Sequence, residues 1–155
     1  MRRILSLLFV AAALVSAQKY TGPQPPKSDL PYIRHAANLI ATEPVEANEQ
    51  KGGTGTLWTI DGPNSPSKTP LALPIFIIKA DKLNPASLQM YLLESKEGHR
   101  ELTAAKKKNA EPIHVQVTRL VGDNLYQLDV YNGLDAGEYA LIQEGSTRMF
   151  CFQVF

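Results

Sequence analysis

Polar and apolar side chains alternate along three stretches in the second half of the chain. In residues 87–94, leucine or methionine at every second position alternates with Gln89 and Tyr91, and residues 113–121 and 125–130 repeat the pattern. A period of two places every second side chain on the same face of a strand. Each stretch therefore predicts a β-strand with one buried face.

The run Leu-Ala-Leu-Pro-Ile-Phe-Ile-Ile-Lys at residues 71–79 is the most apolar one after the N-terminal region. Its residues beyond Pro74 do not alternate, which is typical of a central strand covered on both faces. Further strands are predicted at residues 54–60 and, more briefly, at 99–102.

Turn-forming residues separate these stretches at positions 61–70, 95–98 and 122–124. Between them no apolar pattern supports a helix of convincing length. Many short strands divided by turn signals indicate an all-β fold. We predict an antiparallel β-sandwich of about seven to nine strands over residues 54–155.

The last seven residues, Met-Phe-Cys-Phe-Gln-Val-Phe at 149–155, carry no charge. As a strand they would turn one set of side chains to the core and the other set away from it. The first set is Phe150, Phe152 and Val154, and the second is Met149, Cys151, Gln153 and Phe155.

An uncharged edge strand pairs readily with other strands, so something should cover this one. Met149, Gln153 and Phe155 are the candidate edge contacts. We favour residues 32–40 of the same chain as the cover. The alternative is a protein partner or self-association through the C-terminal strand.

The N-terminus has the layout of a secretory signal peptide. Arg2 and Arg3 precede an apolar run, and small residues at positions 15 and 17 suit cleavage before Gln18. The run is short for a membrane span, so we expect removal of residues 1–17 and no transmembrane segment afterwards. The exported protein would be periplasmic or extracellular. Residues 18–30 would form a Pro-rich linker and residues 31–53 an extended arm before the sandwich.

Charge and cysteine content narrow the possible partners. The formal net charge is +1 and stays near zero without Arg2 and Arg3, which gives no support for nucleic-acid binding. Cys151 is the only cysteine, so an internal disulfide is excluded. Its thiol is either a small buried apolar group or a possible intermolecular thiol.

The sequence Leu134-Asp-Ala-Gly137-Glu-Tyr139 resembles the tyrosine corner of immunoglobulin-like β-sandwiches. The resemblance implies that the Tyr139 hydroxyl bonds back to the backbone a few residues upstream. Paired cysteines with a tryptophan between them are absent, so the chain departs from antibody-type domains. Gly-Glu-Tyr-Ala-Leu followed by a Phe-rich strand is also similar to small exported bacterial proteins of uncharacterised function, which implies no activity.

No pattern of catalytic or metal-binding residues is present. His35, His99 and His114 are scattered, and neither a calcium loop nor a Gly-x-Ser-x-Gly elbow occurs. We therefore expect no enzymatic activity, no metal and no cofactor.

The expected function is that of a non-enzymatic binding or structural module acting through a sheet edge or through the loops at 61–70 and 103–111. The alternative is a carbohydrate- or small-ligand-binding accessory domain. In that case Trp58 and Tyr91 would be the stacking platforms.

Overall fold

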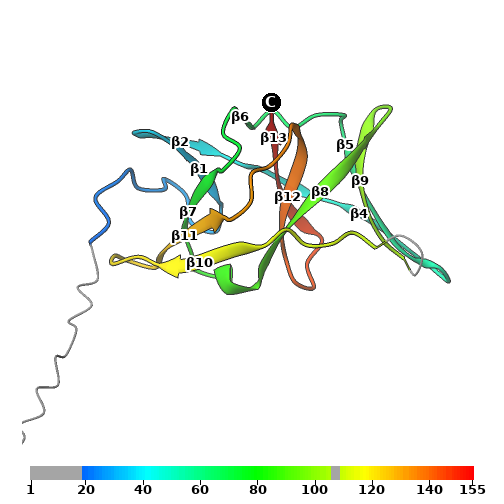
Figure 1. Ribbon diagram of the computed structural model, residues 1–155. Helices are drawn as coiled ribbons and strands as arrows, with labels where there is room; N and C mark the ends of the chain where they lie inside the picture. Colours follow the sequence, from blue (N-terminus) through cyan, green and yellow to red (C-terminus); the bar gives the residue numbers. More distant parts are fainter. Residues whose placement is uncertain (1–18, 106–108) are drawn as a thin grey trace, which may run out of the picture.

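The computed structural model describes residues 19–105 and 109–155 (Figure 1). The predicted signal peptide at 1–17 and the lysines at 106–108 lie outside the described residues. The described part contains thirteen β-strands, a 3-10 turn at Pro85–Ser87, and two sheets whose main pairings are antiparallel. The prediction of an all-β sandwich is confirmed, with more strands than expected because residues 31–53 and 61–70 also form strands.

The smaller sheet has five strands. Its order is β10 (Val115–Arg119), β11 (Leu125–Val130), β7 (Ile75–Lys79), β1 (Tyr32–His35) and β2 (Asn38–Ala41). The strand β7 lies in the middle, and Phe76, Ile77 and Ile78 are fully buried. Burial of consecutive residues means that both faces of β7 are covered, as its unbroken apolar run predicts.

The larger sheet has eight strands. Seven of them follow the order β3 (Glu43–Glu46), β13 (Arg148–Val154), β12 (Gly137–Gln143), β8 (Leu88–Lys96), β9 (His99–Ala105), β5 (Gly55–Asp61) and β4 (Asn48–Gly52). The eighth, β6 (Lys68–Thr69), pairs in parallel with β13. Figure 1 places β4, β5 and β9 on the side of the molecule away from the smaller sheet.

The larger sheet curls so that the strands at its two ends, β3 and β4, follow each other in the chain. The strands β3 and β4 stand at opposite ends of the strand order, yet only Ala47 separates them in the chain. The Ala47 N–H donates to the carbonyl of Thr147 over 3.0 Å, which holds the junction against the β12–β13 turn. Val45 and Ala47 pack in one buried cluster, while Glu49 and Lys51 line a cleft above it. Every second side chain of 43–52 thus points into the curl.

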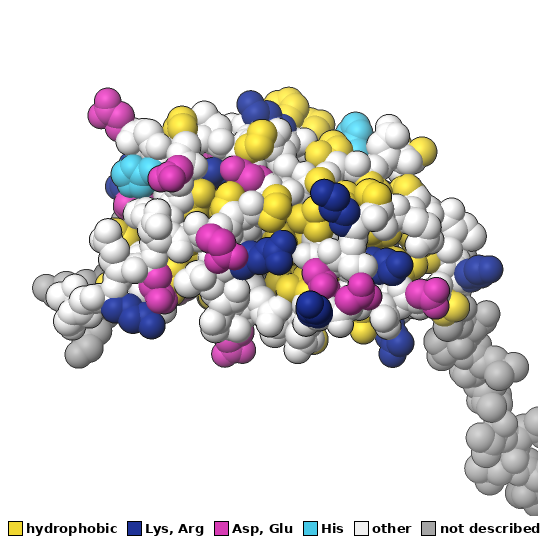
Figure 2. All heavy atoms as spheres, turned by 180° about the vertical axis from the view of Figure 1, so that it is seen from behind, with side chains coloured by type: hydrophobic (Ala, Val, Ile, Leu, Met, Phe, Trp, Pro, Cys, Tyr) yellow, Lys and Arg dark blue, Asp and Glu magenta, His cyan; other side chains and the backbone are white. Residues whose placement is uncertain are grey.

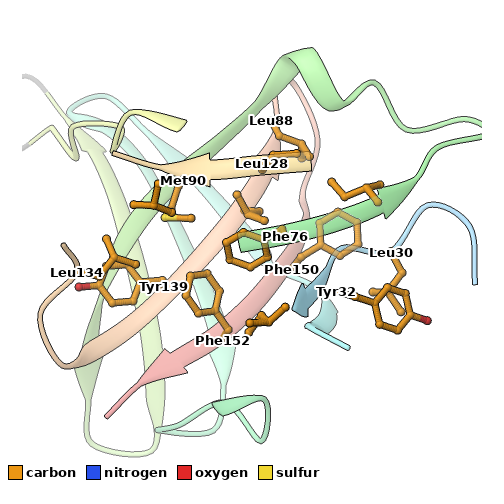
Figure 3. Close-up of a cluster of buried hydrophobic side chains, with 14 of the residues drawn as sticks. Leu30, Tyr32, Phe76, Leu88, Met90, Leu128, Leu134, Tyr139, Phe150 and Phe152 are labelled. Carbon is orange, nitrogen blue, oxygen red and sulfur yellow. The ribbon is translucent and has the colours of Figure 1, made fainter. Parts of the chain in front are cut away.

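The main core fills the space between the two sheets (Figure 3). Phe76 from the smaller sheet meets Phe152 from the larger one edge-to-face, with ring centroids 5.1 Å apart. Tyr139 stacks on the other side of Phe152 at 5.5 Å. These aromatic contacts across the layers add to the burial of Phe150 and Leu128 around them.

A second, smaller core lies inside the curl of the larger sheet. It is formed by residues from five strands and the β3–β4 junction: Ala47, Ile60, Leu93, Leu102, Ala140, Met149 and Cys151. The last strand β13 therefore buries both of its faces. Phe150, Phe152 and Val154 face the main core as predicted, and Met149 and Cys151 face the second core.

The predicted cover of the last strand by residues 32–40 is wrong. Those residues form β1 and β2 of the other sheet. The edge of β13 is instead paired with β3 over residues 148–151 and with β6 at Gln153 and Val154. Part of the cover does come from the 31–53 segment, namely β3, which lies a few residues further along the chain. The strand β1 instead pairs with β7.

The Tyr139 side chain joins its strand to the chain that leads into it. Its hydroxyl donates to the carbonyl of Asp135 over 2.8 Å, and the residue is only 3% exposed. Leu134 is buried beside it, and a Cβ added at Gly137 would lie 3.2 Å from Leu92 Cδ1. A larger residue than glycine at 137 would therefore crowd this corner.

We expect Tyr139→Phe to lower the free energy of unfolding by about 1–3 kcal/mol, because it leaves the Asp135 carbonyl without this donor. Equilibrium urea denaturation measures the change. Tyr131→Phe is the matched control, since Tyr131 is 58% exposed. A loss of only a few tenths of a kcal/mol for Tyr139→Phe would contradict the role assigned to this hydroxyl.

Asp29 fastens the N-terminal segment to the turn after β7. Its Oδ1 accepts the backbone N–H groups of Asp81, Lys82 and Leu83 at 2.8, 2.9 and 2.9 Å. Asp29 has φ of 59°, a left-handed conformation that aspartate and asparagine tolerate better than most residues. Burial by itself would raise the pKa of Asp29, but the three N–H groups and Lys82 hold it below its ordinary value.

We expect Asp29→Ala to lower the free energy of unfolding by about 1–2 kcal/mol at neutral pH. A lowered pKa in the folded protein means that this stabilisation is present above the ordinary pKa of 3.8 and is lost as pH falls through the folded value. Wild type and variant should therefore converge in acid. Urea titrations from pH 7 to pH 3 test this, with Asp123→Ala in another turn as control. A difference that persists unchanged in acid would contradict it.

Candidate functional site

A cleft of about 440 Å³ opens on the concave side of the larger sheet, at one end of its curl. Its apolar lining consists of Trp58, Tyr91, Leu102, Ala104, Ala110, Pro112, Ile142 and Met149. Uncharged polar residues complete the walls, namely Gln89, Thr103, Asn109, Gln143, Gly145, Ser146 and Thr147. The volume falls in the range of small-molecule binding sites.

The cleft owes its shape to an early split between β8 and β9. These strands pair only from Glu94–Lys96 to His99–Glu101, next to their hairpin turn. Beyond that point β8 continues along β12, and residues 109–113 enter the gap. Ala110 N–H donates to the Thr103 carbonyl at 3.0 Å, and Ile113 N–H to the Met90 carbonyl at 2.8 Å. The segment that fills the split also forms one wall of the cleft.

The two aromatic residues that the sequence singles out as stacking platforms line this same cleft. Trp58 lies on β5, opposite Glu49 on β4 and Leu102 on β9, and Tyr91 lies on β8. The Tyr91 hydroxyl donates to Gln89 Oε1 over 2.7 Å. Burial, and then the neighbouring Glu144, raises the pKa of Tyr91 above its ordinary value.

The indole N–H of Trp58 is an unsatisfied donor. Nε1 is closed off from solvent and has no hydrogen-bond acceptor among the described residues. A buried donor without a partner costs about 1–3 kcal/mol, so such atoms are rare in folded proteins. Trp58 lines the cleft, but its N–H is covered by protein atoms, so an acceptor reaches it only where these move aside.

The charged residues of the lining nearly cancel. Lys51 Nζ lies 3.3 Å from Glu49 Oε2 at the mouth of the cleft, and Glu144 is the remaining charge among the described lining residues. Lys51 is 73% exposed, so this ion pair contributes little to stability and its side chains can move. The cleft is thus largely neutral.

The opposite end of the curl is closed by a buried ion cluster. Arg100 is fully buried, and its Nη1 lies 2.8 Å from Glu43 Oε2 and 3.7 Å from Glu138 Oε2. Its other donors reach the carbonyls of Gly62 and Asp61 at 2.9 and 3.0 Å. Burial raises the pKa of Glu138, although the Ser65 N–H and Arg100 act in the opposite direction.

The 61–70 loop is held by this cluster. Ser65 N–H donates to Glu138 Oε2 at 2.9 Å, and Ser67 donates through its hydroxyl to the Ala41 carbonyl. Ser65, Ser67 and Thr69 are buried. The structure therefore places this predicted recognition loop as a cap on the curl. The predicted loop at 103–111 begins as the end of β9, and its described residues Thr103, Ala104, Asn109 and Ala110 line the cleft.

The remaining site residues named from the sequence lie in the last strand. Cys151 has no exposed surface, and burial raises the pKa of its thiol to about 12, against the effect of Arg100. Met149 is buried beneath the cleft, Gln153 pairs through its backbone with Lys68, and Phe155 is 65% exposed. Of the two alternatives left open for Cys151, the structure places it as a small buried group.

Sequence reasoning missed the Arg100 cluster. Arg100 and Leu102 are two residues apart on β9, so their side chains lie on the same face of the strand. This spacing from an apolar residue is the one local signal that the arginine side chain points inward. Glu43 and Glu138 lie far from it in the chain, so no spacing links the three.

The surface charges, the metal-ligating side chains and the helix content of the described residues add little to the choice of a function. Figure 2 shows one face on which Lys or Arg and Asp or Glu side chains are interspersed rather than gathered by sign. Within residues 19–105 and 109–155, no group of three His, Cys, Asp or Glu side chains could hold a metal ion. No helix in the same part of the chain is long and apolar enough to cross a membrane.

No protein-family model matches the chain, and no curated protein or solved structure matches it significantly. The geometry of the cleft is therefore the basis for a functional assignment.

Proposed function

We propose that this protein is an exported, non-enzymatic binding module whose small ligand occupies the cleft between Trp58 and Tyr91. The observation that carries the proposal is the convergence of these two aromatics, from strands on either side of β9, on one concave site. Ligand sites combine apolar walls with a few polar groups that fix orientation, and the amides and hydroxyls of this cleft supply them. Of the predicted loop at 103–111, Thr103 and Ala104 take part from the end of β9, and Asn109 and Ala110 from the segment after it.

The finer fold assignment is part of the proposal. We assign the sandwich to the immunoglobulin-like class, with Leu134, Gly137 and Tyr139 as its tyrosine corner. The bond from the Tyr139 hydroxyl to the Asp135 carbonyl supports it, because a backbone partner a few residues upstream is the mark of that motif. The basic start and apolar run of the first seventeen residues support export to the periplasm or beyond.

Binding through the C-terminal strand is the less favoured mode. The strand β13 is paired with β12 on one side and with β3 and β6 on the other. A partner strand would have to displace β3 or β6 first.

The indole N–H resonance of Trp58 offers a direct test, because the chain has a single tryptophan. We expect some members of a neutral fragment library to shift this one signal in ¹H–¹⁵N spectra. The shifts should be lost or weakened in Tyr91→Ala and kept in Tyr131→Ala, whose tyrosine is exposed and does not line the cleft. A library that leaves the indole signal unmoved, or shifts unaffected by Tyr91→Ala, would refute the binding site.

A further inference from the structure

We propose that the ligand of the cleft is a neutral saccharide, a single sugar or the end of a short oligosaccharide. The inference rests on the proposed binding function and names its ligand class. It follows from three properties of the lining: its charge, its hydrogen-bonding groups, and the placement of its two aromatic rings.

The charges of the cleft disfavour an anionic ligand and give a cationic ligand opposing contacts. An anionic ligand would meet Glu144 and would compete with Glu49 for Lys51, to which Glu49 is already paired at 3.3 Å. A cationic ligand would meet Lys51 in the same mouth, although Glu144 attracts it. A neutral ligand leaves the Glu49–Lys51 pair intact and avoids burying an unpaired charge.

The polar groups of the walls match hydroxyls. Gln143 and Asn109 are amides that both donate and accept, and Gln89 keeps its amide donors because only its Oε1 is used by Tyr91. A sugar hydroxyl also both donates and accepts, so each can be satisfied at once. A hydrocarbon ligand would instead desolvate these groups without pairing them.

The aromatic rings match the C–H faces of a sugar. Trp58 lies on β5 and Tyr91 on β8, and between them stand β9 and residues 109–113, which fill the split beside it. The small side chain of Ala104 and that of Leu102 lie on the intervening strand and line the cleft. A ring lying over Leu102 and Ala104 therefore has an aromatic side chain on either side.

The Trp58 Nε1–H completes the match. It is the one buried side-chain donor of the cleft wall without an acceptor among the described residues, and Glu49 lies opposite Trp58 in the β4–β5 ladder. A sugar hydroxyl that reaches this N–H accepts its hydrogen and removes the penalty of leaving it unpaired.

The experiment follows the single indole N–H signal and the heat of binding of the purified protein with three kinds of probe. The neutral sugars are maltose, cellobiose and N-acetylglucosamine, the anionic sugar is glucuronic acid, and the apolar probe is indole. We expect a neutral sugar to shift the Trp58 signal, and Tyr91→Ala to weaken its binding by on the order of tenfold. Tyr131→Ala should leave the affinity unchanged, and glucuronic acid should bind more weakly than the neutral sugars.

The outcomes separate this inference from the proposed function. If indole or glucuronic acid binds at Trp58 and the neutral sugars do not, the assignment of a neutral saccharide is overturned while the binding function stands. If no probe and no library fragment moves the signal, both are wrong. A sugar that binds equally well to Tyr91→Ala occupies another surface, which also overturns the assignment.

Discussion

Replacement of Arg100 by methionine should lower the free energy of unfolding by about 3–5 kcal/mol. The side chain of Arg100 is fully buried, and methionine fills much of the same volume without its charge or donors. Its loss leaves Glu43 and Glu138 without their shared counter-charge and removes the donor from two backbone carbonyls of the 61–62 turn. Equilibrium urea denaturation at pH 7 measures the loss.

Two controls separate the buried cluster from general effects of charge. Lys96→Met removes a half-exposed cation bound to Glu94 and Glu101, and should lower the free energy of unfolding far less than Arg100→Met does, because solvent screens this ion pair. Adding Glu138→Gln to Arg100→Met removes one stranded carboxylate and should recover part of the loss. A loss for Arg100→Met as small as that for Lys96→Met would contradict the role given to the cluster.

The pH dependence of Arg100→Met has a defined sign. Burial already raises the pKa of Glu138, and removing Arg100 raises it further because a lowering influence disappears. A carboxyl with a raised pKa in the folded protein binds its proton more tightly folded than unfolded. The variant should therefore regain stability relative to wild type as pH falls toward the ordinary value of 4.5.

Truncation of Phe152 to alanine should also cost about 3–5 kcal/mol. The ring of Phe152 has no exposed surface and contacts Phe76 of the smaller sheet and Tyr139 of its own sheet (Figure 3). Its removal opens a cavity between the two layers and ends both aromatic contacts. Thermal and urea denaturation should agree on the loss.

Phe155→Ala is a matched control for this prediction. Phe155 is the same residue type three positions along the chain, yet it is 65% exposed and should change stability by less than about 0.5 kcal/mol. Equal losses for the two variants would mean that the interface between the sheets does not depend on Phe152 as the geometry indicates.

The strands in the second half of the chain follow from local pattern. The alternation through residues 87–94 and 125–130 corresponds to β8 and β11, and the apolar run after Pro74 corresponds to the central strand β7. The sequence also predicted which side chains of the last strand face the main core, because successive side chains of a strand point to opposite faces. Trp58 and Tyr91 could be named from their type alone, but nothing local placed them in one cleft.

The strands in the first half of the chain are harder to predict from the sequence, because their polar and apolar residues do not alternate cleanly. Glu43–Glu46 and Asn48–Gly52 are mostly polar, with Val45 and Ala47 as their apolar residues on the inner face. Such segments form strands because a partner offers a free edge: β13 for the first and β5 for the second. No periodicity in the segment itself carries that information.

What the sequence by itself determined is therefore the class of the fold and the identity of its core strands, because alternation and turn residues act over a few neighbours. The tertiary structure alone decided that the larger sheet curls through Ala47, that Arg100 meets Glu43 and Glu138, and that the split of β8 from β9 opens a cleft beside Trp58. These features depend on pairings between residues distant in the chain, whose free energy comes from the partner strand rather than from the local sequence.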